Sequence, residues 1–164
     1  MQEFVIDRIF AAPREVVFRA FTESARMKQW WGPKGFSVLK SDIDLKPGGI
    51  HHYLLKGPDG ALIWGKFLYR EIVAPERIVW LNSFSDEAGG TTRHPMMPTW
   101  PLEMHSTALF ETVGEADTRF TIKWTPHNAN PIKAATFAAG HASMTMGWNG
   151  TFDQLAEYLK GAAA

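Results

Sequence analysis

The last part of the chain carries the hydrophobic pattern of a helix. From Pro131 to Lys160, large side chains recur at steps of three and four residues, the spacing that places them on one face of an α-helix. That face consists of Phe137, His141, Met144, Trp148, Phe152, Leu155 and Leu159. Small or polar residues form the opposite face: Lys133, Ala138, Asn149, Asp153 and Glu157. We therefore predict one long amphipathic helix over 131–160.

Three glycines lie inside this pattern: Gly140, Gly147 and Gly150. Each costs about 1 kcal/mol relative to Ala in a helix, so they indicate positions where another group approaches the helix backbone. The alternative is a kink or break near Gly147. A helix of roughly 30 residues is ~45 Å long and needs a large surface to pack against.

The preceding segments alternate apolar and polar residues, which is the period of a half-buried strand. Predicted strands are residues 4–10, 36–45, 50–56, 62–73, 77–84, 103–113 and 118–125. Short turn sequences such as Lys46-Pro47-Gly48-Gly49 make neighbouring strands antiparallel. Residues 13–22 and 24–30 predict two short helices, of which Pro13 opens the first. Residues 85–102 are expected to form a loop.

These elements predict an α+β fold. A curved antiparallel sheet of about seven strands wraps around the long C-terminal helix, because the inner face of the sheet and the apolar helix face bury each other. The two short helices follow the first strand. We expect residues 1–164 to form a single domain, which suits this length. A bent sheet cannot contact a straight helix along its whole length, so we also expect a cavity between them.

Composition narrows the classes of partner. Lys plus Arg and Asp plus Glu number 17 each, without a basic run, so we expect neither nucleic acid nor a membrane as a partner. The absence of cysteine excludes disulfides and thiol chemistry. Met1 leads into strand-like sequence without a signal-peptide pattern, and we expect a cytoplasmic protein. Seven Trp, eleven Phe and seven Met form a large apolar inventory that suits an adaptable ligand cavity.

Four segments carry a resemblance to a known family. They are APREVVFRAFT at 12–22, WWGPKGF at 30–36, DLKPGG at 44–49 and GWNGTFDQLAEYL at 147–159. Together they resemble the START/birch-pollen-allergen (SRPBCC) superfamily, in its branch of activator-of-heat-shock-protein-ATPase-like proteins. Within that branch the chain resembles bacterial proteins similar to the calicheamicin resistance protein. The resemblance implies the helix-grip fold. It leaves function open, since this scaffold serves lipid carriers, hormone receptors and polyketide cyclases.

Strand alternation and the helical stripe assign side chains to the wall of the expected cavity. Taken singly, each aromatic or Met residue is explained as ordinary core, but together they favour a ligand site. Four polar members would lie in apolar surroundings, where an unpaired polar group costs about 1 to 3 kcal/mol. The predicted ligand-binding residues are Trp31, His51, Tyr53, Trp80, Asn82, Phe84, Trp100, Ser106, Trp124, His141, Met144 and Trp148.

Three functions fit these residues. The first is binding of a small hydrophobic, ring-containing molecule. The second is a cyclase, dehydratase or hydrolase that uses His51, Tyr53 or His141 as acid–base groups. The third is a protein-partner or stress-response module, and both a monomer and a homodimer fit the sequence. We expect no metal site, because His51 and His52 are adjacent in a strand and point to opposite faces. We expect no cofactor, because the glycine pairs at 48–49 and 89–90 lack the setting of a phosphate loop.

Overall fold

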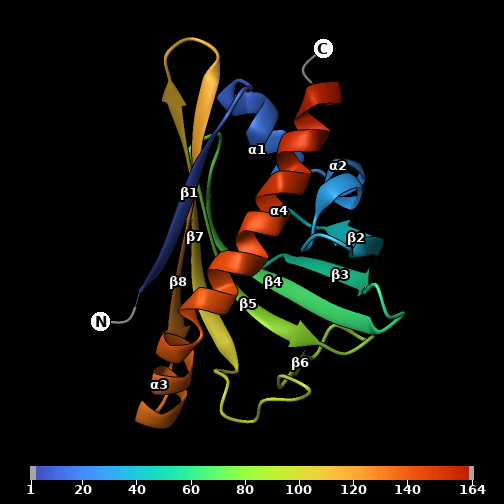
Figure 1. Ribbon diagram of the computed structural model, residues 1–164, viewed down its shortest axis with the longest axis vertical. Coiled ribbons are helices and arrows are strands. Elements are labelled where there is room, and N and C mark those ends of the chain that lie inside the picture. Colours follow the sequence, from blue (N-terminus) through green and yellow to red (C-terminus); the bar gives the residue numbers. More distant parts are fainter. Residues whose placement is uncertain (1–2, 163–164) are drawn as a thin grey trace.

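One antiparallel sheet curls around the C-terminal helix in the computed structural model, which describes residues 3–162 (Figure 1). Seven strands lie side by side in the order β1-β8-β7-β5-β4-β3-β2, and the short β6 pairs with β5. The elements are β1 (Phe4–Phe10), α1 (Arg14–Thr22), α2 (Ser24–Trp30), β2 (Ser37–Ile43), β3 (Ile50–Lys56), β4 (Leu62–Val73), β5 (Arg77–Ser85), β6 (Thr91–Thr92), β7 (Glu103–Val113), β8 (Asp117–His127), α3 (Pro131–Ala139) and α4 (His141–Ala162).

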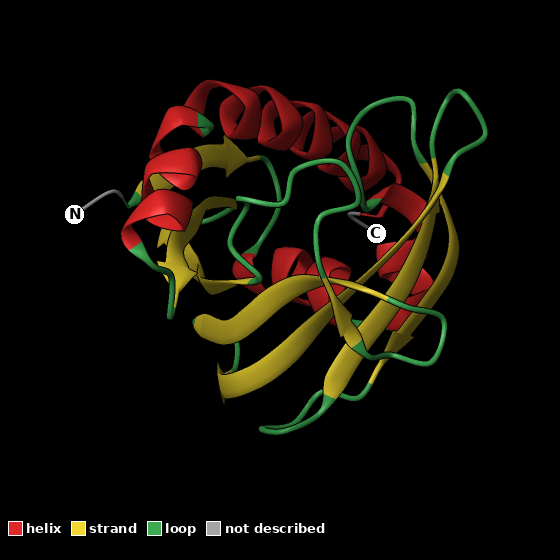
Figure 2. Cartoon of the chain, turned by 90° about the horizontal axis from the view of Figure 1, so that it is seen from below, coloured by secondary structure: helices red, strands yellow, loops and turns green. Residues whose placement is uncertain are grey.

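This architecture confirms the predicted α+β helix-grip fold. α1 and α2 follow the first strand, and α4 runs diagonally across the concave face of the sheet (Figure 1). The view from below shows the sheet bending beneath the helix (Figure 2). Register shifts between Val38 and Lys40 and between Tyr69 and Glu71 mark local irregularities, and such bulges bend a strand and increase its twist. β6 was not predicted, because two residues are too few to show alternation.

The prediction of one continuous helix over 131–160 is wrong, and so is the alternative of a break near Gly147. The break lies at Gly140, which separates α3 from α4, and Gly147 lies inside α4. The Gly140 N–H donates to the Phe137 carbonyl at 3.0 Å, a bond that tightens the last turn of α3. Trp100 packs on the same glycine, 3.2 Å from the position that a Cβ would take.

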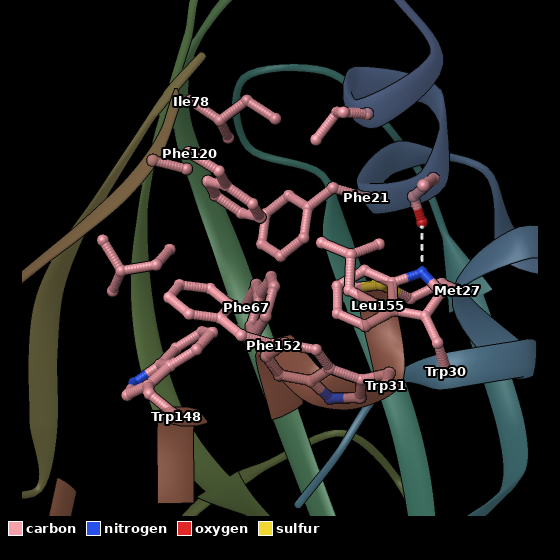
Figure 3. Close-up of a cluster of buried hydrophobic side chains, with 14 of the residues drawn as sticks. Phe21, Met27, Trp30, Trp31, Phe67, Ile78, Phe120, Trp148, Phe152 and Leu155 are labelled. Carbon is pink, nitrogen blue, oxygen red and sulfur yellow. Dashed lines mark hydrogen bonds between the residues drawn. The ribbon is translucent and has the colours of Figure 1, made fainter. Parts of the chain in front are cut away.

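The end of the sheet beside α1 and α2 holds a solid aromatic core (Figure 3). The ring of Phe21 lies 5.3 Å from that of Phe120 and 5.5 Å from that of Trp80, and Phe152 of α4 lies 5.6 Å from Phe120. The indole N–H of Trp30 donates to the Ala20 carbonyl at 2.9 Å, drawn as a dashed line. Burying each such ring contributes roughly 1.5 to 3 kcal/mol, so this end anchors the fold.

Candidate ligand cavity

A cavity of about 260 Å³ lies between α4 and the concave face of the sheet. Its strand residues are Tyr53, Leu55, Ile63, Trp64, Gly65, Phe67, Trp80, Asn82, Ser83, Phe84, Met104 and Trp124. α4 contributes Met144, Gly147, Trp148 and Thr151. Two loops close its rims, with Trp31, Gly32 and Pro33 on one side and Trp100, Pro101 and Leu102 on the other. No charged side chain lines the cavity among the residues that the structure describes.

Nine of the twelve side chains predicted to bind a ligand line this cavity. They are Trp31, Tyr53, Trp80, Asn82, Phe84, Trp100, Trp124, Met144 and Trp148. They come from β3, β5, β8, α4 and both rim loops, so the fold brings together residues that are far apart in sequence. The remaining three, His51, Ser106 and His141, lie elsewhere.

His51 is fully buried behind the cavity wall. Its Nε2 shares a hydrogen bond of 3.0 Å with the Ser41 hydroxyl, and its ring packs 4.9 Å from both Tyr53 and Phe67. Its Nδ1 has no partner among the described residues. Burial, with a smaller contribution from neighbouring His52, lowers the pKa of His51 to about 3. At neutral pH this histidine is therefore uncharged and separated from the cavity.

His141 and Ser106 are kept away from the cavity by their positions in the fold. Because the helix breaks at Gly140, His141 is the first residue of α4, where its ring packs 5.6 Å from Phe4 and 5.4 Å from Phe137. Ser106 is paired across the sheet with Trp80 on one side and Trp124 on the other. Those two larger residues line the cavity in its place.

Tyr53 is the one candidate acid–base residue that lines the cavity. It is paired with Gly65 on β4, and its phenol lies over that glycine, 2.4 Å from the position that a Cβ would take. Any other residue at 65 would collide with the ring. Burial raises the pKa of Tyr53, and the Trp31 side chain beside the hydroxyl partly offsets that rise. Tyr53 therefore stays protonated at neutral pH.

Four buried polar atoms on lining residues have no hydrogen-bond partner within the described chain. They are the indole nitrogens of Trp31, Trp80 and Trp124 and the hydroxyl oxygen of Ser83. An indole N–H can only donate, and a buried donor without a partner costs about 1 to 3 kcal/mol. Because each of these atoms is buried, a ligand in the cavity would reach them only if the side chains moved.

Two of the three glycines of the C-terminal region, Gly140 and Gly150, mark close approaches as the sequence indicated, whereas no described atom lies within 4 Å of the position that a Cβ would take on Gly147. Trp100 covers Gly140, and the backbone nitrogen of Lys34 lies 3.1 Å from the position that a Cβ would take on Gly150. Beside Gly150, the Gln154 amide donates to the carbonyl oxygens of Gly32 and Pro33 at 2.6 and 3.2 Å. Gly147 faces the cavity. Each rim loop thus lies close to the helical region at a glycine that leaves room for it, at Gly140 for one loop and at Gly150 for the other.

Several lining residues were missed from the sequence. Phe67 follows the β4 alternation and was detectable by the same rule, and an interior strand glycine such as Gly65 signals close approach by another group. Gly147 was noted, although not as part of the wall. Ser83 and Thr151 carried no signal, because a lone hydroxyl residue in an apolar segment is common.

Two other classes of site receive no support from the described residues. Across residues 3–162, no three His, Asp or Glu side chains gather closely enough to hold a metal ion. None of the helices in that range combines the length and the apolar character needed to cross a membrane.

Comparison with known proteins gives a consistent family. A sequence model of the family "Activator of Hsp90 ATPase homolog 1-like protein" matches residues 11–160. A search of curated proteins found no significant match. A crystal structure from Nitrosomonas europaea is 26% identical, with a TM-score of 0.75, over 97% of this chain and 94% of the other.

Two more distant structures share the fold. A solution structure from Arthrobacter aurescens is 24% identical, with a TM-score of 0.77, over 99% of this chain and 88% of the other. The AHSA1 protein from Silicibacter pomeroyi is 19% identical, with a TM-score of 0.71, over 96% of this chain and 97% of the other. The match is to the family as a whole, so the narrower resemblance to calicheamicin resistance proteins stays a prediction.

Proposed function

The chain belongs to the family of activator of Hsp90 ATPase homolog 1-like proteins, and we propose that it binds a small hydrophobic, ring-containing molecule between the sheet and α4. The observation that carries this proposal is the cavity itself, about 260 Å³ in volume and walled by aromatic side chains without a charge. Small-molecule sites are typically apolar hollows with a few polar groups that orient the ligand. Here Asn82 and Tyr53 would supply those groups.

The apolar surface that a ligand can bury in this cavity limits its binding affinity. Burying about 250 Å² of apolar ligand surface contributes roughly 6 kcal/mol before the cost of association. Association removes several kcal/mol of that gain, so contacts with apolar surface alone give binding in the millimolar range or weaker. Tighter binding requires hydrogen bonds to the polar groups of the wall.

Native mass spectrometry of gently purified protein tests the proposal, followed by denaturation and small-molecule analysis. We expect a stoichiometric apolar adduct that is lost in the Met144→Ala variant, because Met144 is 7% exposed and lines the cavity. The matched control is Met146→Ala, two residues further along α4 and 77% exposed, which should keep the adduct.

If the wild-type protein shows a bare mass, titration with neutral aromatic compounds, followed by tryptophan fluorescence, decides the question. Six indoles with a quenchable signal line the cavity, those of Trp31, Trp64, Trp80, Trp100, Trp124 and Trp148. A spectrum unchanged by every compound, or equal responses in the Met144→Ala and Met146→Ala variants, would contradict binding at this place.

The enzyme alternative rests on Tyr53, because His51 and His141 do not line the cavity. A protonated phenol in an apolar wall can act as a general acid or as a hydrogen-bond donor to a carbonyl group. Conversion of a bound compound that stops in Tyr53→Phe, with binding retained, would favour catalysis over simple binding.

A further inference from the structure

At Gly147 the helix wall of the cavity carries no side chain. Beyond its own turn of helix, no described atom lies within 4 Å of the position that a Cβ would take. Residue 147 lies three positions after Met144 and four before Thr151, both of which line the cavity, so the three share one helix face. The open space beside Gly147 therefore belongs to the cavity, whereas the spaces beside Gly140 and Gly150 are occupied by protein.

The backbone carbonyl of Gly147 already accepts hydrogen bonds from the protein. The Thr151 hydroxyl donates to the Gly147 carbonyl at 3.0 Å, in addition to the helical bonding of that turn. The wall at Gly147 thus offers neither a charge nor an unpaired side-chain group. A molecule that lies against it would present an apolar edge, because a polar edge would lose its hydrogen bonds with water and gain none here.

Polar groups are found on the strand side of the cavity. Asn82 lies on β5 on the same face as Trp80 and Phe84, and Tyr53 lies on β3; both polar residues line the cavity. No charged side chain accompanies them in the described wall, so an ionised ligand would lose its hydration without gaining a counter-charge. The cavity therefore presents an apolar surface at Gly147 on the helix wall and uncharged polar groups on the strand wall.

The shape of the cavity wall favours a flat molecule. Trp148, next to Gly147, lies 5.6 Å from both Trp31 and Trp124, measured between ring centroids. Aromatic rings in these arrangements pack best on the faces and edges of other planar rings. A missing Cβ deepens the wall by about the width of one methyl group, enough for a ring edge and too little for a bulky branched group.

We propose that the ligand is an uncharged, flat, fused-ring molecule with a ketone-type acceptor oxygen. Its apolar ring edge lies against Gly147, and its oxygen is directed toward the side-chain amide of Asn82. Gly147 is thereby a specificity-determining residue. This inference rests on the proposed function, since it names the class of ligand for the same cavity.

Three probes separate flatness and charge from simple hydrophobicity. 9-Fluorenone is flat and neutral, benzophenone has the same number of carbons but twisted rings, and 9-fluorenone-4-carboxylate is flat and anionic. Binding is measured by tryptophan fluorescence and isothermal titration calorimetry. We expect benzophenone and the carboxylate each to bind at least about tenfold more weakly than 9-fluorenone, since one misplaced group in a fitted pocket changes affinity by roughly 10- to 200-fold.

The variant Gly147→Ala then tests the position of the ring. The added methyl occupies the space of the ring edge, so fluorenone affinity should fall about tenfold or more. The same change removes a helix glycine and should raise the melting temperature, so weaker binding cannot be attributed to unfolding. Gly161→Ala is the control, because Gly161 lies in α4, is exposed and likewise has no atom near its Cβ position. It should leave binding unchanged.

The outcomes distinguish this inference from the proposed function. If none of the three probes binds to the wild-type protein, the proposed function fails and the inference fails with it. If benzophenone or the carboxylate binds as tightly as fluorenone, or if Gly147→Ala keeps full affinity, the cavity is a ligand site but the flat, neutral ligand class and the role of Gly147 are wrong.

Discussion

The two ends of the space between sheet and helix differ although the same strands and the same helix build both. Beside α1 and α2, aromatic rings fill the space: the ring of Phe21 lies within 6.0 Å of those of Phe67 and Phe120 (Figure 3). Toward α3, Trp148 borders a cavity of about 260 Å³. Sheet curvature alone therefore does not decide whether the interior is solid or hollow.

The difference lies in what closes each end. α1 is a helix that inserts Phe18 and Phe21 into the space beneath the sheet. The opposite end is covered by the segment between β6 and β7, which packs Trp100 on Phe137 and Gly140 but leaves Met96 88% exposed. α1 packs a whole apolar helix face into the interior, whereas the segment between β6 and β7 contributes the single ring of Trp100 and leaves space behind it.

The largest effect that tests this comparison is on stability. Phe120→Ala in the solid end should lower the free energy of unfolding by about 3 to 5 kcal/mol, because the rings around Phe120 cannot close the space that it leaves. Phe84→Ala removes the same ring beside the cavity, where Phe84 is only partly buried, and should cost no more than half as much. Urea denaturation measures both, and equal losses would show that the two ends are packed alike.

The second effect is a dependence of stability on pH, caused by His51. Its pKa is about 3 in the folded protein and about 6.5 in the unfolded chain, so below pH 6.5 the unfolded state binds the proton more readily. Stability is therefore complete above pH 6.5 and falls as the pH drops toward 3. Between pH 6.5 and 4.5 we expect a loss of roughly 2 to 3 kcal/mol from this residue.

The His51→Gln variant isolates this contribution from the titration of carboxylates. Gln keeps a polar group near the Ser41 hydroxyl but does not titrate. Its free energy of unfolding, followed by denaturation at several pH values, should fall less steeply than that of the wild-type protein between pH 6.5 and 4.5. Parallel pH profiles for the two proteins would mean that His51 is not held neutral by burial.

The sequence predicted the fold well because local rules decide most of it. Alternation located β3 and β4 at their observed bounds, since each strand has one face on the core and the other outside. The helix break at Gly140 was not predictable in the same way. Trp100 packs at that position, and no rule of spacing links two residues forty positions apart.

The site was predictable in its aromatic members and less so in its polar ones. Strand parity placed Tyr53 and Trp80 in the cavity wall, but the same parity also selected His51 and Ser106, which face the core at depths that parity cannot distinguish. Parity says which face a side chain occupies. How far along that face the cavity extends depends on the loops and helices that fill its ends.

The smallest effect concerns the rim loop that joins α2 to β2. The Gln154 side-chain nitrogen donates to the carbonyl oxygens of Trp30, Gly32 and Pro33 at 3.3, 2.6 and 3.2 Å. Gln154→Ala should cost about 1 kcal/mol of stability and speed amide hydrogen exchange in this loop, because its carbonyl groups lose their shared donor.

Glu157→Ala, one turn further along α4, is the matched control, since its exposed ion pair with Lys160 contributes little. If Gln154→Ala instead left exchange in the rim loop unchanged, the solid end of the molecule would hold this loop without help from the helix. The cavity rim would then be as rigid as the core beside it. Faster exchange confined to the rim would show that the hollow end depends on single hydrogen bonds where the solid end depends on packing.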